Sequence, residues 1–332
     1  MMRVLVLSHS DVLAALPPEA CAEAMAAVLA EHARGGTFMP LRSVMMPPDA
    51  AGFMGLMPGW RGPQRDAAAI FALKAVCIMP GNPARGLDAH QGLVTLFDGE
   101  TGQPNAILDA SAVTEVRTAA VTAVATRALS RPDARTLAIL GAGTQARAHL
   151  EALLPVREFE QVRIYAPTEA HARVLVEQAS GAGAELRVAS SAEGAVRDAD
   201  VVVTATSSRE PVLRRGWLKP GAHLNAVGAS TPRARELDTA TVAASALFCD
   251  SRESLRHEAG EFQLAVAEGL IAGEEHVRAE LGEVLAGTAP GRRDAGELTL
   301  FRSLGLAIED LAAAETAVAA ARAAGLGTEV EV

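Results

Sequence analysis

The sequence predicts an α/β fold, with a Rossmann-type parallel-sheet domain plus a discontinuous α+β domain. Three observations support this prediction. A glycine-rich turn at residues 141–146 lies between an apolar run and a helical pattern. After Thr136, strand-like and helix-like segments alternate, which is typical of a parallel sheet with right-handed crossovers. The first half lacks this alternation and is rich in Gly, Pro and Met between Met39 and Thr95.

The first half is expected to form a largely antiparallel sheet with helices packed on it. A helix is predicted over residues 18–33, where apolar side chains recur at helical spacing. Short apolar runs predict strands at 53–57, 71–76, 93–97 and 104–109. The segment Asp98-Gly99-Glu100-Thr101-Gly102 is typical of a hairpin turn between the last two. A helix rich in Ala and Thr is predicted over 114–129.

The second half is expected to form the parallel sheet. The predicted strands are 136–140, 161–165, 185–188, 200–204, 223–227 and 247–250, and the intervening helices are 145–154, 169–179 and 192–196. A final helix over 305–324 cannot extend this sheet, so it is expected to pack on the first half. The expected domains are therefore residues 1–120 with 306–332, and residues 121–305.

Composition argues against several classes of partner. The formal net charge of −10 argues against nucleic acid, and an aromatic content of 3% disfavours a stacking platform for bases. Apolar runs fall short of the ~18 residues of a membrane span, and the run at the N-terminus is too short for a signal peptide. Cys21, Cys77 and Cys249 have neither metal-ligand nor disulfide-framework spacing. A cytoplasmic protein without a metal site is therefore expected.

The turn Gly141-Ala142-Gly143-Thr144-Gln145-Ala146 has the G-x-G-x-x-A pattern of a dinucleotide site. Gly141 permits the tight turn, and Gly143 allows the backbone to approach a phosphate. Ala146 is small enough for close packing of the helix on the strand. The start of the helix offers N–H groups and a partial positive charge to the pyrophosphate. The sequence therefore predicts a cofactor of the NAD type.

The end of the second strand favours NADP(H), with NAD(H) still possible. An Asp or Glu usually binds the adenosine ribose there, but this chain reads Tyr165-Ala166-Pro167-Thr168. Thr168 can donate a hydrogen bond to a 2′-phosphate, and His171 or Arg173 can supply positive charge. The alternative is that His171 and Arg173 merely face solvent on a helix.

The chain also resembles the ornithine cyclodeaminase/mu-crystallin family nearly from end to end. The matching segments are Met39–Arg42, Gly55–Pro58, Lys74, Pro80–Asn82, His90-Gln91, Arg117–Ala120, Gly141–Ala146, Gly228–Ser230 with Pro232, Glu236–Asp238, Glu280–Glu283 and Ser303–Gly305. The resemblance implies a homodimer whose first domain serves substrate binding and dimerisation. The expected cofactor site continues at Thr204, Ala205, Thr206, Val227, Gly228 and Ser303.

The resemblance also implies roles for cationic residues in the first half. Arg42 and Arg117 are expected to bind a substrate carboxylate, for which a guanidinium fork is well suited, although either can instead be a structural ion pair. Lys74 is expected to be the central catalytic lysine, since a lysine among cations can move protons near neutral pH. Its alternative is to face solvent from an alternating strand. His90 is either a proton relay or a core histidine.

Ser230 decides the expected reaction. Ornithine cyclodeaminases carry an Asp at this position, two residues before a proline, and a serine cannot neutralise a substrate ammonium group. The segment Gly228-Ala229-Ser230 resembles the mu-crystallin branch, so Ser230 is counted among the catalytic residues of a ketimine reductase. The expected substrates are small α-imino acids such as pyrroline-2-carboxylate or piperideine-2-carboxylate. The alternatives are an alanine dehydrogenase-like amino-acid dehydrogenase, an ornithine or lysine cyclodeaminase, and a non-enzymatic binding protein.

Overall fold

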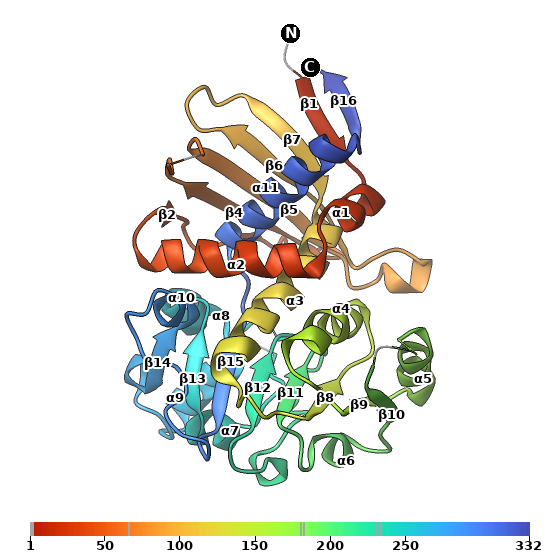
Figure 1. Cartoon of the computed structure of the whole chain (residues 1–332), viewed down its shortest axis with the longest axis vertical. Coiled ribbons are helices and arrows are strands. Elements are labelled where there is room, and N and C mark those ends of the chain that lie inside the picture. Colours follow the sequence, from red (N-terminus) through yellow and green to blue (C-terminus); the bar gives the residue numbers. More distant parts are fainter. Residues whose placement is uncertain (1–2, 66, 180, 182, 230, 233) are drawn as a thin grey trace. The chain divides into compact units, whose positions relative to one another are not determined.

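A computed structural model describes residues 3–332 except 66, 180, 182, 230 and 233. The chain divides into two compact units (Figure 1). Unit 1 comprises Met1–Arg117 and Gly305–Val332, and unit 2 comprises Thr118–Leu304. Within the described residues no single helix has the length and apolarity to cross a membrane. One pair of helices, His9–Ala15 and Pro18–Ala33, is long and apolar enough when the two are taken together, but the pair is bent by 80°.

Unit 1 contains one mixed sheet that is largely antiparallel, as predicted. Its strand order is β16 (Thr328–Glu331), β1 (Arg3–Leu7), β7 (Pro104–Asp109), β6 (His90–Asp98), β5 (Ile70–Ile78), β4 (Phe53–Arg61) and β2 (Thr37–Phe38), and β3 (Ser43–Met45) also pairs with β4. The exception is the parallel pair β1–β7. Strands β4, β5 and β6 are longer than their apolar runs. The antiparallel register continues over nine residue pairs between β4 and β5 and again between β5 and β6.

The helices of this unit include α1 (His9–Ala15), α2 (Pro18–Ala33), the first part of α3 (Ala110–Leu129) and α11 (Ala307–Ala324). Helix α11 packs against α1 and α2 and against β4, β5 and β6, so the expected return of the last helix to the first half is confirmed (Figure 1). The approach is close, because a Cβ at Gly59 on β4 would lie 3.3 Å from Ala307. Helix α11 begins two residues later than predicted, after Gly305 at φ +80°.

Unit 2 contains a parallel sheet, as predicted. Its strand order is β10 (Glu185–Val188), β9 (Gln161–Tyr165), β8 (Thr136–Leu140), β11 (Val201–Thr204), β12 (His223–Ala226), β15 (Thr299–Arg302), β13 (Ala246–Cys249) and β14 (Val277–Glu280). The six predicted strands lie within one residue of their expected bounds. Strands β14 and β15 were not predicted, and β15 enters between β12 and β13.

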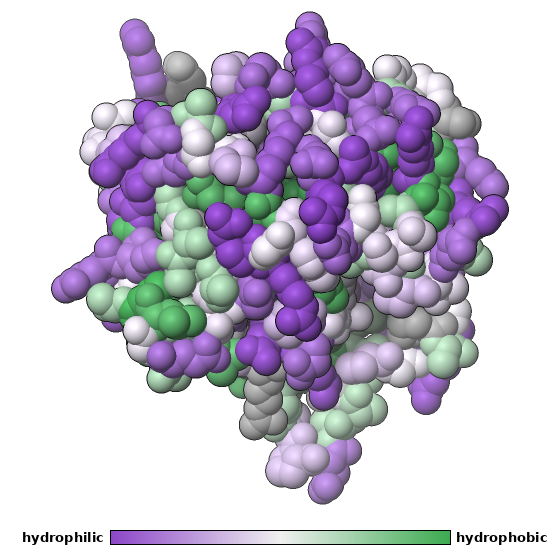
Figure 2. All heavy atoms as spheres, turned by 90° about the horizontal axis from the view of Figure 1, so that it is seen from below, coloured by the Kyte–Doolittle hydropathy of each residue, from purple (hydrophilic) through white to green (hydrophobic). Residues whose placement is uncertain are grey.

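The helices of unit 2 cover both faces of its sheet. They are α4 (Thr144–Leu153), α5 (Glu169–Gln178), α6 (Ala192–Val196), α7 (Thr239–Ala244), α8 (Arg252–Glu258), α9 (Gly260–Ala267) and α10 (Leu281–Leu285), with the end of α3. Alternate residues of β8 enter different cores: Leu137 and Ile139 pack with α4 and α5, whereas Ala138 and Leu140 pack with α6, α7 and α9. The space-filling view shows mainly hydrophilic residues with scattered apolar patches on the face seen from below (Figure 2).

Candidate active site and cofactor site

The glycine-rich turn of unit 2 has the backbone geometry that its sequence predicts. Gly141 follows β8 at φ +127°, and its N–H donates to the carbonyl of Tyr165 at 2.8 Å. A Cβ on Gly141 would lie 2.4 Å from the carbonyl oxygen of Ala205, the residue after β11. Strands β8 and β11 are neighbours in the sheet, and the chain leaves them in opposite directions. The turn therefore lies at the topological switch point, where open α/β sheets bind ligands.

Gly143 provides the open space that a pyrophosphate requires. It precedes α4 in an extended conformation, and a Cβ built on it meets nothing within 4 Å. The first N–H groups of a helix have no partner within that helix, so the start of α4 at Thr144 and Gln145 is suited to an anion. Ala146 is fully buried in the core beside β8. This part of the chain therefore fits a dinucleotide, with Ala142 half-buried within the turn.

The end of β9 carries the residues expected near the adenosine ribose. β9 ends at Tyr165, and Thr168 precedes α5 without making a side-chain capping hydrogen bond. Arg173 forms an exposed ion pair with Glu169, one helical turn earlier, at 2.5 Å. In this structure Arg173 therefore lies on the solvent face of α5, as the alternative interpretation expected.

Glu236 is a buried carboxylate to which the sequence analysis gave no role. It accepts hydrogen bonds from the Thr204 hydroxyl at 2.8 Å and from the N–H groups of Thr206 and Gly228, both at 2.7 Å. A Cβ on Gly228 would lie 2.0 Å from the Thr206 carbonyl oxygen. Glu236 thus joins the segments that follow β11 and β12. The signal available in the sequence was the segment Glu236-Leu237-Asp238, which matched the family motif without indicating a contact.

The other expected cofactor residues of unit 2 continue the hydrogen-bond ladder at the same edge of the sheet. The Ala205 N–H donates to Leu140 at 2.9 Å, and the Val227 N–H donates to Thr204 at 3.0 Å. Ser303, which is buried, donates its N–H to Ala226 at 3.0 Å. The structure therefore brings Thr204, Ala205, Thr206, Val227, Gly228 and Ser303 to the carboxyl ends of adjacent strands.

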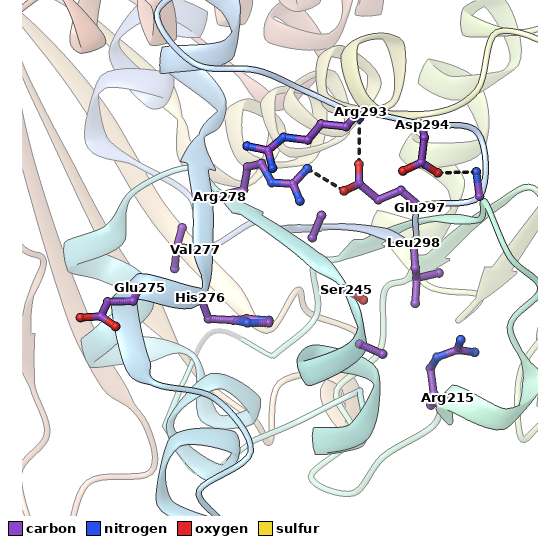
Figure 3. A pocket seen from close by; sticks show the side chains of 13 residues that line it. Arg215, Ser245, Glu275, His276, Val277, Arg278, Arg293, Asp294, Glu297 and Leu298 are labelled. Atoms are coloured by element: carbon purple, nitrogen blue, oxygen red, sulfur yellow. Dashed lines mark hydrogen bonds and ion pairs between the residues drawn. The ribbon is translucent and has the colours of Figure 1, made fainter.

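A separate hollow of about 810 Å³ lies at the opposite, amino-terminal edge of the sheet in unit 2 (Figure 3). Its walls include Ala246 and Val277, which begin β13 and β14. Arg278 and Glu297 point toward each other there and form an ion pair at 2.6 Å. None of the sequence-predicted site residues that the structure describes lines this hollow.

In unit 1, Lys74 points into the protein interior from β5. The side chains of β5 alternate between the two faces of the sheet, and those on the inner face are buried: Ile70, Ala72, Lys74 and Val76. Lys74 is 3% exposed, so the interpretation in which it faces solvent is wrong. Its Nζ donates to Oδ1 of Asp310 on α11 at 3.1 Å.

Arg117 on α3 contacts the same carboxylate. Its Nε donates to Asp310 Oδ1 at 3.0 Å, and its Nη1 donates to Glu309 Oε2 at 3.0 Å. Arg117, Glu309 and Asp310 are all buried. Arg117 is therefore part of a buried ion-pair cluster, and Glu309 and Asp310 are members that the sequence analysis missed. The family resemblance drew attention to cations, whereas these carboxylates lie in an alanine-rich helix some 200 residues away in sequence.

Gly305 brings Arg42 and Arg117 together. Arg42 lies between β2 and β3, and its Nη2 donates to the Gly305 carbonyl at 2.8 Å. A Cβ on Gly305 would lie 2.7 Å from Nη1 and 2.8 Å from Nη2 of Arg117. The positive φ and the close guanidinium thus both require glycine here. We call Arg42, Lys74, Arg117, Glu309 and Asp310 the lysine cluster; it contains three cationic and two carboxylate side chains.

The cluster changes the proton affinity of its members. Burial lowers the pKa of Lys74 to about 8, Arg117 and Arg42 act in the same direction, and Asp310 opposes them. Burial alone would raise the pKa of Asp310, but Lys74 and Arg117 hold it below its usual value. Lys74 can therefore gain or lose a proton near neutral pH beside an ionised carboxylate.

His90 begins β6, and its side chain is 53% exposed, so it is not a core histidine. Partial burial lowers its pKa, and the positive charge of Lys74 acts in the same direction, whereas Asp88 opposes them. Asp88 Oδ1 lies 3.8 Å from His90 Nδ1.

Ser230 lies outside the described residues. Among those described, no group of three or more His, Cys, Asp or Glu side chains is arranged to hold a metal ion.

The chain is similar to known proteins over nearly its whole length. A model of the ornithine cyclodeaminase/mu-crystallin family matches residues 2–324. Ketimine reductase mu-crystallin of Mus musculus is 39% identical over 293 residues, covering 88% of each chain. The structure of Thermococcus litoralis Delta(1)-pyrroline-2-carboxylate reductase in complex with NADH and L-proline has a TM-score of 0.94 and 36% identity, covering 98% of this chain and 100% of the other.

An archaeal alanine dehydrogenase dimer with bound NAD has a TM-score of 0.92 and 34% identity, covering 99% of each chain. These matches cover nearly the whole chain. They agree with the motifs that suggested the family and with the Rossmann-type unit of the structure. The chain therefore belongs to the ornithine cyclodeaminase/mu-crystallin family.

Proposed function

We propose that this protein is an oxidoreductase that reduces small α-imino acids, with cyclic ketimines such as pyrroline-2-carboxylate or piperideine-2-carboxylate as the substrate class. The observation that carries the proposal is the buried Lys74, which has a pKa of about 8 and lies among two arginines and two carboxylates. An imine accepts hydride far better when its nitrogen is protonated. A lysine that holds a proton near neutral pH is suited to keep it so.

The cationic residues then divide two tasks between them. Arg42 and Arg117 bind the substrate carboxylate, and the surplus of one positive charge within the lysine cluster matches a single carboxylate. Lys74 donates a proton to the imine nitrogen, directly or through water. NAD(P)H, when bound at the glycine-rich turn, supplies the hydride for the imine carbon. His90 and Ser230 are proposed to line the same pocket, and unit 1 is proposed to be the domain for substrate binding and dimerisation.

The proposal includes a preference for NADPH. No carboxylate stands between the end of β9 at Tyr165 and Thr168, so nothing in that segment repels a 2′-phosphate. The nearest acid, Glu169, forms an exposed ion pair with Arg173, and such pairs contribute only about 0–1 kcal/mol. Arg173 can therefore turn toward a phosphate at little cost. The Thermococcus litoralis and archaeal structures hold NADH and NAD, so comparison of KM for the two cofactors tests this preference directly.

The second candidate function is reductive amination of a 2-oxo acid, favoured by the similarity to an archaeal alanine dehydrogenase. It uses the same carboxylate ligands and the same hydride but requires ammonia. Cyclodeamination of ornithine or lysine is disfavoured, since Ser230 cannot neutralise a substrate ammonium group. The two reductive functions differ in whether oxidation of the cofactor depends on ammonium.

A homodimer is part of the proposal. Phe71 on β5 and Leu93 on β6 lie on the opposite side of the sheet from Lys74 and are 46% and 51% exposed. Phe71 pairs in register with Trp60 and with Phe97, and its ring lies 6.4 Å from that of Trp60. A contiguous apolar sheet face of this kind marks an interaction surface. We propose that a second copy of the chain covers this face. We also propose a cytoplasmic location, where Cys21, Cys77 and Cys249 stay free thiols.

Lys74→Ala tests the proposed catalytic role. Turnover of the cyclic imine should be abolished, while NADPH binding, measured by fluorescence titration, should be nearly unchanged because the cofactor turn lies in unit 2. Lys219, the only other lysine of the sequence, is the matched control: its Nζ pairs with Asp200 at 2.7 Å. Lys219→Ala should retain turnover. Normal turnover by Lys74→Ala would refute the assignment.

A further inference from the structure

We propose that Asp310 is a positioning residue that holds Lys74 in its protonated form and aims its ammonium group, so that the reaction has a proton donor. This inference rests on the proposed imine reduction and adds to it a residue outside the family motifs noted in the sequence. The geometry is specific. One oxygen, Asp310 Oδ1, accepts from Lys74 Nζ at 3.1 Å and from Arg117 Nε at 3.0 Å.

Apart from Asp310, the main influences on Lys74 disfavour its positive charge. It is 3% exposed, and Arg117 and Arg42 add like charge. His90 on β6 is a further group whose proton affinity responds to Lys74, and the Cys21 thiol on α2 lies in the field of the same cluster. Burial raises the pKa of Cys21 to about 12, so this thiol supplies no negative charge near neutral pH. Asp310 is thus the carboxylate in direct contact with Lys74 among the described residues.

The neighbouring carboxylate, Glu309, has a different task. It accepts from Arg117 Nη1 at 3.0 Å and from the Leu306 N–H at 3.2 Å, which caps the start of α11. Both carboxylates therefore contact Arg117, but Glu309 also caps the helix end, whereas Asp310 is the one that contacts Lys74. The N-terminal turn of α11 also favours negative charge, which helps to keep Asp310 ionised. Its other oxygen, Oδ2, is buried and has no hydrogen-bond partner among the described residues, so its two cations do not saturate the carboxylate.

The two lysines of the sequence allow a direct test. The wild-type protein, labelled with ¹⁵N at lysine Nζ and ¹³C at Cε, should give two lysine signals, and Lys219→Ala should remove one and so assign the other. The Lys74 signal should titrate near pH 8. In Asp310→Asn its midpoint should fall by about one pH unit or more, because a contacting opposite charge is lost. Glu309→Gln, an equally buried change on the same helix, should shift it by less than half as much.

The catalytic readout must follow the titration. The kcat/KM for the cyclic imine should fall as pH rises through the Lys74 midpoint, and in Asp310→Asn this alkaline limb should move to lower pH by the same amount. If Asp310→Asn fails to bind NADPH and is therefore misfolded, Asp310→Ala measured with and without formate replaces it. Formate should then return the limb toward its wild-type position.

The outcomes separate the two claims. If wild-type protein shows the Lys74 titration but does not reduce cyclic imines, the proposed function fails. If wild-type protein reduces imines but the midpoint and the alkaline limb stay unchanged in Asp310→Asn, the role of Asp310 is overturned. Loss of thermal stability in Asp310→Asn with an unchanged Lys74 midpoint would show a purely structural ion pair and would equally overturn it.

Discussion

Gly305→Ala should disturb Arg42 and Arg117, the two proposed ligands of the substrate carboxylate, at once. Gly305 precedes α11 at φ +80°, and its carbonyl accepts from Arg42 Nη2 at 2.8 Å. The new Cβ would lie 2.7 Å from Arg117 Nη1 and 2.8 Å from Nη2, closer than nonbonded carbon and nitrogen atoms approach. The guanidinium cannot simply swing away, because Glu309 and Asp310 hold it on two sides.

The expected loss of stability has two parts. A non-glycine residue in the left-handed region costs about 1–2 kcal/mol. Displacement of Arg117 weakens a buried ion pair, and breaking such a pair costs about 3–5 kcal/mol. Because Arg117 can shift partway without losing both carboxylates, we expect a total loss of about 2–5 kcal/mol in the free energy of unfolding. We also expect KM for the imino acid to rise tenfold or more, which corresponds to about 1.4 kcal/mol of binding.

Gly325→Ala is the matched control. Gly325 ends the same helix at φ +66°, but a Cβ there meets nothing within 4 Å. It should show the backbone cost of about 1–2 kcal/mol and an unchanged KM. Urea unfolding and steady-state kinetics of both variants give the comparison. Equal stability losses together with a wild-type KM in Gly305→Ala would refute the reasoning about Arg42 and Arg117.

Three further predictions concern unit 2 and the sheet face of unit 1. Gly141→Ala should lower both thermal stability and NADPH affinity, because its Cβ would lie 2.4 Å from the Ala205 carbonyl oxygen. Gly143→Ala should fold normally and lose only cofactor affinity, because its Cβ would meet nothing within 4 Å. If the two variants behaved alike in fluorescence titration and in thermal unfolding, this reasoning would be contradicted. Glu236→Gln should lose about 1–3 kcal/mol of stability and weaken NADPH binding, since the amide NH₂ cannot accept the hydrogen bonds that a carboxylate oxygen accepts. Glu210→Gln, at an exposed glutamate, is the control. An unchanged Kd for NADPH in Glu236→Gln would argue against a positioning role. Phe71→Glu should convert a dimer to a monomer in sedimentation velocity, whereas Leu13→Glu on α1 should not; a dimeric Phe71→Glu would place the interface elsewhere.

Much of the fold could be predicted because local patterns determine it. The strands of unit 2 from Thr136 to Val188 have their predicted bounds, since apolar runs there alternate with amphipathic helices. The position of β15 between β12 and β13 could not be predicted. Its four residues, Thr299–Arg302, carry no periodic signal, and strand order depends on long-range packing. The extent of β5 is likewise set by pairing with its neighbours.

The candidate site could be predicted only in part. Lys74 was visible as a lysine within an otherwise apolar strand, and Arg117 was found through the family resemblance. The sequence could not tell a buried Lys74 from an exposed one. Asp310 and Glu309 were missed because an acidic pair at the start of a helix is ordinarily a capping feature. Their contact with Lys74 and Arg117 arises only when α11 packs on β5.

The most direct test of imine reduction is the oxidation of NADPH, followed at 340 nm, with piperideine-2-carboxylate alone and with pyruvate plus ammonium. The proposal predicts rapid oxidation with the preformed cyclic imine and no need for ammonium. Oxidation only with pyruvate and ammonium would contradict it and identify an amino-acid dehydrogenase.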